Sequence, residues 1–404
     1  MRASVPSRDP EAASGVDPSG PTPPTHRAWA EIDLGAVRDN MRALRAALRA
    51  PARMMAVVKA DAYGHGACEV ARAAVEAGAA SLGVATMEEG QELRRAGVRA
   101  PILLLGYTSP EDAETAVAHD LSVTVFQREM AHALSAAASR VGRSASVHVK
   151  IDTGMGRIGV SPADAAALIR DISAYGGILV EGVCTHFATA DEPDLAAARR
   201  QWEIFLSVLR DLEAQRLPCG TRHAANSAAL LALPEAHLDL VRVGLALYGI
   251  PPARHLAGKV PLRPVMRFLA RVGHVKRVAA GTPIGYGHAY RAPRETTIAT
   301  VAVGYGDGYP RLAGGTGTVV LGGSRVGIAG RVSMDQCTVD AADLPVSVGD
   351  VAELWGETLP VTDVAEAAQT IPYEVLAGVS RRVPRVFVRD GRVVGARTLL
   401  GDAS

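Results

Sequence analysis

Residues 54–66, MMAVVKADAYGHG, place a lysine where a run of apolar residues gives way to small residues and glycines. The run MMAVV has the length and composition of a buried strand, and the following GACEVARAAVEAGA is typical of a helix rich in small residues. Lys59 therefore lies at the carboxyl end of a predicted strand. A lysine is rarely buried unless it is paired, so Lys59 either reaches solvent along its aliphatic stem or has a chemical role.

The alternation of strand and helix continues along the chain. Short apolar runs separated by alanine-rich amphipathic segments indicate βα units around a parallel sheet. Eight runs fit this pattern: MMAVVK (54–59), SLGVA (81–85), PILLL (101–105), LSVTVF (121–126), SVHVKI (146–151), ILVEGVC (178–184), TRHAA (221–225) and LDLVRVG (238–244). Eight such units predict an α/β protein with a (β/α)8 barrel of the TIM type. The alternative is a doubly wound open sheet, which usually has fewer strands and a longer glycine-rich turn than GHGA after the first one.

The composition and pattern of the sequence change near residue 265. Segments such as TIATVAVGYG (297–306) and GTVVLGGSRVGIAGRVSMDQCTV (317–339) are rich in β-branched residues and glycine, and no long helical pattern follows them. A proline-rich stretch, PPARHLAGKVPLRPVM, precedes the change, as is typical of a link between domains. We predict a disordered tail over residues 1–27, the barrel over residues 28–265, and a C-terminal, mostly β-strand domain over residues 266–404.

Composition excludes several classes of partner. With 43 Lys and Arg against 42 Asp and Glu, the net charge is +1, so the chain has no basic field for nucleic acid or anionic lipid. The four cysteines form no C-x-x-C pair, which argues against a zinc site or a disulfide framework. No run approaches the ~20 apolar residues of a membrane span, and the tail lacks the apolar core of a signal peptide. We therefore expect a cytoplasmic protein that binds a small molecule or a second copy of itself, with no metal.

Polar side chains end or follow most of the predicted strands. In a barrel the carboxyl ends of the strands form the mouth, where active sites lie. From the first strand onward, these side chains are Lys59, then Lys150, Asp152 and Arg157, then His186, then Asn226 and Ser227, and Arg242. Each has a structural explanation when taken alone, and a single histidine such as His186 is more often a hydrogen-bonded core residue. Their convergence on one end of the barrel indicates a functional site.

The segments after the last two strands point to a phosphate group. NSAA (226–229) and VGLALYG (243–249) offer a hydroxyl and exposed backbone N–H groups next to each other, at the usual phosphate site of such barrels. A lysine opposite a phosphate site, with an arginine near the base of the pocket, suggests pyridoxal 5'-phosphate. Lys59 would form a Schiff base with this cofactor, a role that requires a partly desolvated lysine with a depressed pKa.

Five motifs in this order resemble those of the alanine racemase family. They are AVVKADAYGHG (56–66), KIDTGMGRIG (150–159), VRVGLALYG (241–249), VGYGDGYPR (303–311) and GRVSMDQ (330–336). The resemblance extends over nearly all of residues 28–395. It implies a pyridoxal-phosphate enzyme that interconverts L- and D-alanine by two-base proton transfer on the cofactor aldimine and supplies D-alanine for peptidoglycan. It also implies a head-to-tail homodimer with shared active sites.

The resemblance implies a role for each matched residue. Lys59 would hold the cofactor and act as one catalytic base, and Tyr305 would be the other base, supplied to the partner subunit's site. Further cofactor contacts would come from Tyr63, His186, Asn226, Ser227, Arg242, Gly244, Leu245 and Tyr373. Among these, Arg242 would face the ring nitrogen, and His186 would connect it to Tyr305.

Substrate contacts are implied in the same way. Arg157 would hold the substrate carboxylate, and the backbone of Met334 would contact the substrate. Lys150 matches a lysine that is carbamylated in many relatives, where it becomes an anion that orients the arginine. Two positions depart from the commonest family pattern, because Gly306 replaces an alanine and Gly285 a serine. These departures leave open the size of the pocket and the breadth of substrates.

Three rival functions share this barrel. A serine or broad-specificity amino-acid racemase would differ only in its pocket. A non-catalytic pyridoxal-phosphate-binding barrel would lack the C-terminal domain that carries Tyr305. A decarboxylase of the same two-domain plan would have a carboxylate at the ring nitrogen, where this chain has Arg242. These features favour a racemase.

Overall fold

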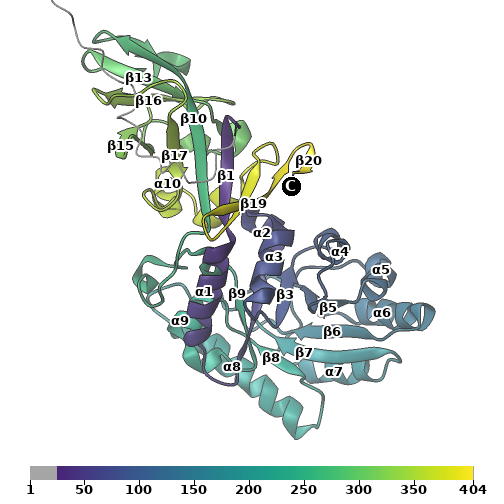
Figure 1. Ribbon diagram of the computed structural model, residues 1–404. Helices are drawn as coiled ribbons and strands as arrows, with labels where there is room; N and C mark the ends of the chain where they lie inside the picture. Colours follow the sequence, from purple (N-terminus) through teal and green to yellow (C-terminus); the bar gives the residue numbers. More distant parts are fainter. Residues whose placement is uncertain (1–24, 404) are drawn as a thin grey trace, which may run out of the picture.

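The eight predicted runs form the strands of a nearly closed parallel barrel in the computed structural model, which describes residues 25–403 (Figure 1). The order in the sheet is β8-β7-β6-β5-β4-β3-β2-β9. Backbone hydrogen bonds from Asp239 to Arg222 (3.1 Å) and from Arg242 to Ala225 (3.0 Å) connect the two ends. The predicted barrel is confirmed, with strands β2 (Arg53–Val57), β3 (Ser81–Val84), β4 (Ile102–Leu104), β5 (Leu121–Val125), β6 (Ala145–Lys150), β7 (Ile178–Cys184), β8 (Thr221–His223) and β9 (Leu240–Val243).

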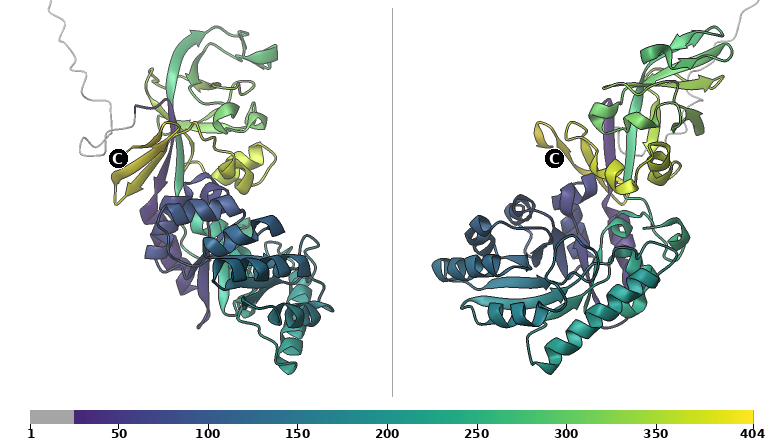
Figure 2. Two further views of the ribbon diagram at one scale, coloured as in Figure 1. Left: turned by 90° about the vertical axis from the view of Figure 1, so that its right-hand side faces the viewer. Right: turned by 180° about the vertical axis from the view of Figure 1, so that it is seen from behind.

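Helices cover the outside of the barrel, as Figure 2 shows from two further sides. Their apolar residues recur every three or four positions, so one face of each packs inward; α8 buries Trp202, Phe205, Leu209 and Leu212 in this way. No helix within residues 25–403 is long and apolar enough to span a membrane. The helices are α1 (Leu34–Ala46), α3 (Ala67–Glu76), α4 (Met87–Arg95), α5 (Ala113–Ala118), α6 (Arg128–Val141), α7 (Ala165–Ser173), α8 (Ala196–Ala214) and α9 (Ser227–Ala232), with the short α2 (Lys59–Gly64) at the end of β2.

The C-terminal domain is built around one long strand, β10 (Met266–Val278), in a ten-stranded sheet. Two short helices, α10 (Val361–Ala367) and α11 (Pro372–Ala377), pack beside it. The strands β11 (Pro283–Ile284) and β12 (Tyr290–Arg291) form a separate hairpin. The other strands of the large sheet are β1 (Ala28–Asp33), β13 (Thr296–Val301), β14 (Thr318–Leu321), β15 (Ser324–Gly327), β16 (Cys337–Ala342), β17 (Val351–Trp355), β18 (Arg385–Arg389), β19 (Arg392–Thr398) and β20 (Gly401–Ala403).

Strand β1 corrects the predicted domain boundary. The sequence pattern places residues 28–33 in the barrel, but β1 pairs antiparallel with β10 and parallel with β18 in the sheet of the β-domain. The barrel therefore starts with α1. Both partners of β1 lie far away in sequence, so a local pattern cannot reveal this pairing. Of the predicted tail, residues 1–24 lie outside the described residues, and Arg27 already forms an ion pair with Asp307 at 2.6 Å.

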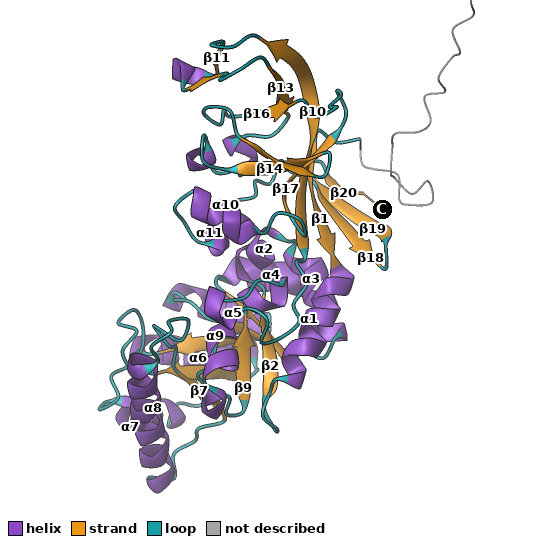
Figure 3. Cartoon of the chain, turned by 90° about the vertical axis from the view of Figure 1, so that its left-hand side faces the viewer, coloured by secondary structure: helices purple, strands orange, loops and turns teal. Residues whose placement is uncertain are grey.

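The two domains meet at the barrel mouth. Helix α11 of the β-domain packs against α2, directly after Lys59 (Figure 3). Gly64 lies at this contact with φ of +79°, and a Cβ there would clash with the backbone carbonyl of Leu376. The Arg385 Nε–H donates a hydrogen bond to the Gly64 carbonyl at 3.0 Å. The segment that carries Lys59 is thus held by both domains.

Candidate active site

Lys59 begins a short turn with unusual handedness. The four residues after it, 60–63, have φ of 51–53° and ψ of 44–53°, so they form one turn of left-handed helix. Each left-handed residue with a side chain costs roughly 1–2 kcal/mol. Strained backbone of this kind persists only where its surroundings hold it, and it concentrates at functional sites. The turn therefore marks the end of β2 as part of a built site.

Side chains from two neighbouring regions hold this turn. The Ala60 N–H donates to Glu89 Oε1 at 2.6 Å, and the Ala67 N–H donates to Asp61 Oδ1 at 2.9 Å. The Asp61 carboxylate also pairs with Arg397, from β19 of the other domain, with Nη1 and Oδ1 3.0 Å apart. Glu89 and Arg397 lie outside the five motifs that resemble the family. A pattern on a single chain contains no signal that would connect them to Lys59.

The Lys59 side chain has no fixed partner. Among residues 25–403, no hydrogen bond or ion pair involves its amine. Burial and the nearby positive charge of Arg157 lower the pKa of Lys59, and Glu89 opposes this shift. A depressed pKa increases the fraction of neutral amine, which is the form that attacks a carbonyl. Lys59 is therefore a partly buried amine at the mouth, without a partner in the described residues.

Arg242 is buried at the base of the mouth, and its terminal nitrogens are fully used. Nη1 donates to His223 Nδ1 (2.8 Å) and to the His223 carbonyl (3.1 Å). Nη2 donates to the carbonyls of Thr185 (2.8 Å) and Ala224 (2.9 Å) and lies 3.1 Å from His186 Nδ1. A guanidinium has five N–H donors. The Nε–H is the donor left without an acceptor in the described part of the chain, and it is available to a ligand acceptor such as a pyridine nitrogen.

Several cations gather around this pocket. Burial, followed by Arg242 and Arg157 among the nearby positive charges, lowers the pKa of Lys150 to about 8. Burial and the charge of Arg242 hold the pKa of His186 well below its ordinary value. No ion pair within residues 25–403 includes Lys59, Lys150, Arg157 or Arg242. Such a cluster attracts anionic groups, including phosphates and carboxylates.

The loop that carries Arg157 is shaped by one carboxylate. Asp152 Oδ1 accepts hydrogen bonds from the backbone N–H groups of Gly154 and Gly156, each at 3.0 Å. These bonds curl the chain after β6, so that Arg157 returns to within electrostatic reach of Lys59 and Lys150. Asp152 thus positions the loop, while Arg157 itself remains exposed.

A cradle for an anion lies after β8 and β9. The N–H groups of Gly244 and Ala246 converge on the Ser227 hydroxyl, at 2.9 and 3.4 Å. A Cβ at Gly244 would be 2.7 Å from the Tyr63 hydroxyl, so only glycine lets this phenol approach the backbone here. The Tyr373 ring meets Tyr63 edge-on at 5.6 Å. Asn226 Oδ1 caps α9 by accepting from the Ala229 N–H at 2.9 Å.

These features fit pyridoxal phosphate. The cradle between Ser227, Gly244 and Tyr63 offers the Ser227 and Tyr63 hydroxyls to a phosphate, next to the backbone N–H groups of Gly244 and Ala246 that donate to Ser227 Oγ. Lys59 offers a free amine for the aldehyde, and the Nε–H of Arg242 is available to a ring nitrogen. Leu245, which starts a 3-10 helix (Leu245–Tyr248), continues the backbone of the cradle.

Two of the residues singled out by the sequence lie in the β-domain. Tyr305 starts a 3-10 helix (Tyr305–Asp307) and is 41% exposed, and Met334 is 54% exposed. The two segments are joined by backbone hydrogen bonds from Tyr305 to Ser333 (3.0 Å) and from Gly306 to Met334 (2.8 Å). Within the described residues, no hydrogen bond or ion pair connects Tyr305 or Met334 to Lys59.

The two departures from the family pattern have local explanations. A Cβ at Gly306 would be 2.6 Å from Arg382 Nη2 and 3.0 Å from the Met334 carbonyl, so an alanine there would displace the arginine. Gly285 has φ of +71°, a conformation that favours glycine. Both departures therefore follow from the backbone and side chains around them.

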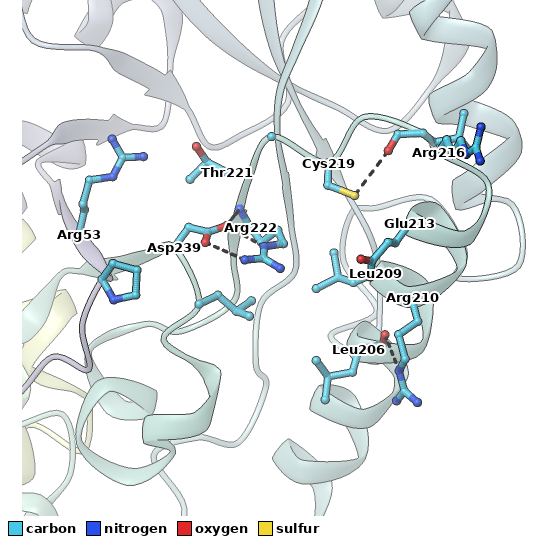
Figure 4. Close-up of a pocket in the computed structure, with 14 residues that line it drawn as sticks. Arg53, Leu206, Leu209, Arg210, Glu213, Arg216, Cys219, Thr221, Arg222 and Asp239 are labelled. Carbon is cyan, nitrogen blue, oxygen red and sulfur yellow. Dashed lines mark hydrogen bonds and ion pairs between the residues drawn. The ribbon is translucent and has the colours of Figure 1, made fainter.

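The opposite end of the barrel has a separate cavity of about 890 Å³ (Figure 4). It is lined by the start of β2 and β8, by α8, and by the loop that contains Cys219. Arg222 and Asp239 form a two-pronged ion pair there, with N–O distances of 2.8 and 2.9 Å. The amino ends of barrel strands generally serve stability rather than chemistry, and none of the predicted site residues lies in this cavity.

Comparison with known proteins identifies the family. The family model for the N-terminal domain of alanine racemase matches residues 32–252, and that for the C-terminal domain matches residues 265–387. The chain belongs to the alanine racemase family. The family is pyridoxal-phosphate-dependent, which agrees with the predicted cofactor. The match to both domains also sets aside a non-catalytic barrel and a decarboxylase.

Individual members of the alanine racemase family are closely similar along their whole length. The alanine racemase of Symbiobacterium thermophilum is 49% identical over 364 residues, covering 89% of this chain and 96% of that protein. The alanine racemase of Desulforamulus reducens is 48% identical over 364 residues, covering 89% and 98%.

Solved structures of alanine racemases have the same two-domain fold. That from Streptomyces lavendulae superposes with a TM-score of 0.87 at 43% identity, covering 90% of this chain and 98% of that chain. That from Bacillus anthracis with bound L-Ala-P also has a TM-score of 0.87, at 37% identity, covering 94% and 99%. These comparisons confirm the predicted fold class of barrel and β-domain.

Proposed function

We propose that this protein interconverts L- and D-alanine with pyridoxal phosphate bound at the barrel mouth. The observation that carries the proposal is Lys59, an unpaired amine of depressed pKa that shares the mouth with Arg242 and the Ser227 cradle. When bound, pyridoxal phosphate withdraws electrons from the α-carbon of an amino acid and so acidifies its α-proton. The protein has to supply the bases, hold the carboxylate and exclude competing reactions.

Lys59 serves one face of the substrate. Burial and the charge of Arg157 lower its pKa and so increase the fraction of neutral amine, the form that can take the α-proton from that face and return it. Racemisation also needs a second base on the opposite face. A single lysine cannot reach both faces of a flat system.

Tyr305 is the second base in this proposal, and it acts in the site of a second subunit. It lies in the β-domain and makes no hydrogen bond to the mouth residues of its own chain among residues 25–403. A head-to-tail homodimer would bring Tyr305 and Met334 of the partner subunit to each barrel mouth. The dimer therefore completes the site.

Arg157 would hold the substrate carboxylate, and Lys150 would orient Arg157. Arg157 is exposed at the mouth without an ion pair in the described residues, so its guanidinium is available to a carboxylate. Lys150 is close enough for the two positive charges to interact unfavourably. Its depressed pKa favours carbamylation, since only a neutral amine reacts with carbon dioxide. A carbamylated Lys150 would be an anion that orients Arg157.

Arg242 limits the reaction to racemisation. A guanidinium does not release its proton, so a donor at this position holds the cofactor ring nitrogen without protonating it. By leaving the ring nitrogen unprotonated, Arg242 would keep the electron withdrawal weaker and so disfavour the side reactions of transamination and decarboxylation. Arg242 therefore serves specificity rather than maximum electron withdrawal.

In the cell we place this activity in the cytoplasm, where it would supply D-alanine for peptidoglycan. The test is chiral analysis of alanine after incubation of the purified protein, loaded with pyridoxal phosphate, with each enantiomer. We expect both reactions to approach an equal mixture, with serine turned over more slowly. If alanine of either hand stays unchanged while serine racemises, the protein is a serine racemase of the same fold; if neither reacts, the proposal is wrong.

A further inference from the structure

A series of polar contacts runs from Arg242 through the inside of the barrel to its floor, the end at which the strands begin. Arg242 Nη1 is 2.8 Å from His223 Nδ1, and His223 Nε2 is 2.8 Å from His148 Nδ1. His148 Nε2 is in turn 3.5 Å from Glu181 Oε2. Each of the four residues comes from a different strand: β9, β8, β6 and β7. We name this set the Glu181 chain.

The chemistry of Arg242 and of Glu181 decides which atom donates and which accepts in each hydrogen bond between them. A guanidinium only donates, so His223 Nδ1 has to accept. Burial and the charge of Arg242 hold the pKa of His223 well below its ordinary value, so the ring is neutral and carries its single proton on Nε2. That proton is donated to His148 Nδ1, which leaves His148 Nε2–H directed at the Glu181 carboxylate. Both histidines are therefore Nε2–H tautomers.

The surroundings of the Glu181 chain are built to hold it. A Cβ at Gly182 would clash with the His148 ring and with the Thr221 carbonyl, so glycine makes room for the imidazole. The Ser122 hydroxyl donates to Glu181 Oε2 at 2.7 Å. The bond from His148 and the bond from Ser122 lower the pKa of Glu181, so this carboxyl is ionised.

The Glu181 chain reaches close to solvent at the barrel floor. The Glu181 side chain is 36% exposed, whereas His148 is buried. Both line a small cavity of about 70 Å³ together with Arg53 and Thr221. Arg53 and Thr221 also line the floor cavity of Figure 4, on the opposite side of the sheet ends from the mouth. A charge on the floor is thus connected to the catalytic end.

Arg242 needs such a connection because its own contacts contain no carboxylate. Burying a charge is costly unless it is paired or fully hydrogen-bonded, and no ion pair in the described residues includes Arg242. We propose that Glu181, His148 and His223 are positioning residues that supply the buried Arg242 guanidinium with a counter-charge from the barrel floor. They also hold Nη1 and so leave the Nε–H for the cofactor. The inference rests on the proposed role of Arg242 at the ring nitrogen.

The proposal predicts what the loss of the floor charge does. Glu181→Gln keeps an acceptor for His148 and removes only the charge, so the guanidinium becomes a stronger donor. We expect the 15N resonance of the ring nitrogen, in holoenzyme loaded with labelled pyridoxal phosphate, to move toward the protonated form. We also expect kcat to change by about tenfold with KM nearly constant, a typical size for such coupling. His148→Leu, which interrupts the chain, should change both quantities at least as much.

The matched control is Asp239→Asn. It removes a carboxylate from the same floor, but Asp239 pairs with Arg222 and has no link to Arg242. We expect its ring 15N shift and kcat to equal those of wild type. If Glu181→Gln behaves like this control while wild type racemises alanine, the Glu181 chain has no role in the reaction. If wild type itself does not racemise, the proposed function fails instead.

A measurement independent of activity tests the hydrogen bonds of the Glu181 chain. In protein with 15N-labelled histidine, with and without pyridoxal phosphate, the resonances of His148 and His223 should both report Nε2–H tautomers. Assignment can use His148→Gln and His223→Gln. An Nδ1–H tautomer or a doubly protonated ring at His223 would overturn the proposal, whatever the activity of the enzyme.

Discussion

Arg222 at the floor of the barrel and the cations around Lys59 at its mouth differ in their partners. At the floor, Arg222 is neutralised by a two-pronged contact with Asp239. At the mouth, Lys59, Lys150 and Arg157 take part in no ion pair among residues 25–403, and the pKa of Lys59 and Lys150 is lowered. The backbone differs too, because the left-handed turn after β2 lies at the mouth. Strain and unpaired cations are tolerated where a ligand supplies the missing charge.

This contrast separates residues that keep the barrel folded from residues that work on a ligand. Changes at the mouth should affect cofactor, substrate and rate while leaving the free energy of unfolding nearly constant. Changes at the floor should do the reverse, except along the Glu181 chain.

The largest effect should come from Lys59→Ala. We expect the visible absorbance of lysine-bound cofactor to disappear and racemisation to fall by at least about 10³-fold, since both the cofactor link and one base are lost. Arg210→Ala at the floor, where the Arg210 Nε–H donates to the Leu206 carbonyl, is the control and should retain full activity. A borohydride-reducible adduct on another lysine in Lys59→Ala would contradict the assignment.

The second test asks whether one chain supplies both bases. Lys59→Ala and Tyr305→Phe should each be nearly inactive, with Tyr305→Phe reduced by about 10²-fold or more. Mixed under conditions of subunit exchange, about half of the dimers are heterodimers with one intact site, so activity should approach about a quarter of wild type. Native mass spectrometry can count the heterodimers. If they form but activity stays at the level of the single variants, both bases come from the same chain.

The third test inverts the charge at the base of the mouth. Arg242→Glu should raise protonation of the ring nitrogen, slow racemisation by about 10²-fold and allow long-wavelength absorbance to accumulate during turnover. Stopped-flow spectra with L-alanine measure the absorbance, and chiral analysis measures the rate. An unchanged spectrum together with unchanged turnover would remove Arg242 from the ring nitrogen.

The fourth test concerns Lys150 and pH. Its pKa in the folded protein is about 8, below the ordinary value of 10.5, so the neutral amine becomes dominant above about pH 8. Because carbamylation requires the neutral form, intact mass spectrometry should show added carbon dioxide more often at pH 9 than at pH 7, and more often with bicarbonate. Activity should rise by about two- to fivefold over the same range. Lys150→Met should show neither change, and an identical bicarbonate response in that variant would contradict this role.

The smallest effect should come from the Asp61–Arg397 ion pair, which holds the left-handed turn. Arg397→Ala removes the partly buried contact with Asp61 and should weaken cofactor affinity by about two- to fivefold, the range of such ion pairs. Arg389→Ala removes a comparable ion pair with Glu76, at 3.2 Å, on α3 and outside the turn. Titration with pyridoxal phosphate should show a weaker Kd only for Arg397→Ala. Equal affinities in the two variants would mean that the turn does not depend on Asp61.

The sequence predicted which residues lie at the barrel mouth better than it predicted the residues that support them. The segment MMAVVK ends in a lysine, and VRVG carries an arginine within a buried strand, so both Lys59 and Arg242 could be placed on the mouth from local patterns. Glu89, Arg397 and Glu181 carry no such signal. A glutamate on a surface-like helix or an alternating strand is unremarkable in sequence. The role of such a glutamate depends on which distant backbone group or ring it contacts in the folded protein.

The sequence alone determined the set of eight barrel strands, the change to a β-rich domain near residue 265, and the motifs of the family. These features depend on the spacing of apolar residues and on turn residues, which are local properties of the chain. Tertiary structure decided which sheet β1 joins, the handedness of the turn after Lys59, and the partners of Arg242. His148 and His223 lie 75 residues apart and meet at 2.8 Å because β6 and β8 flank β7 in the curved sheet of the nearly closed barrel. Contacts of this kind form when strands close into a barrel, and no single stretch of chain contains them.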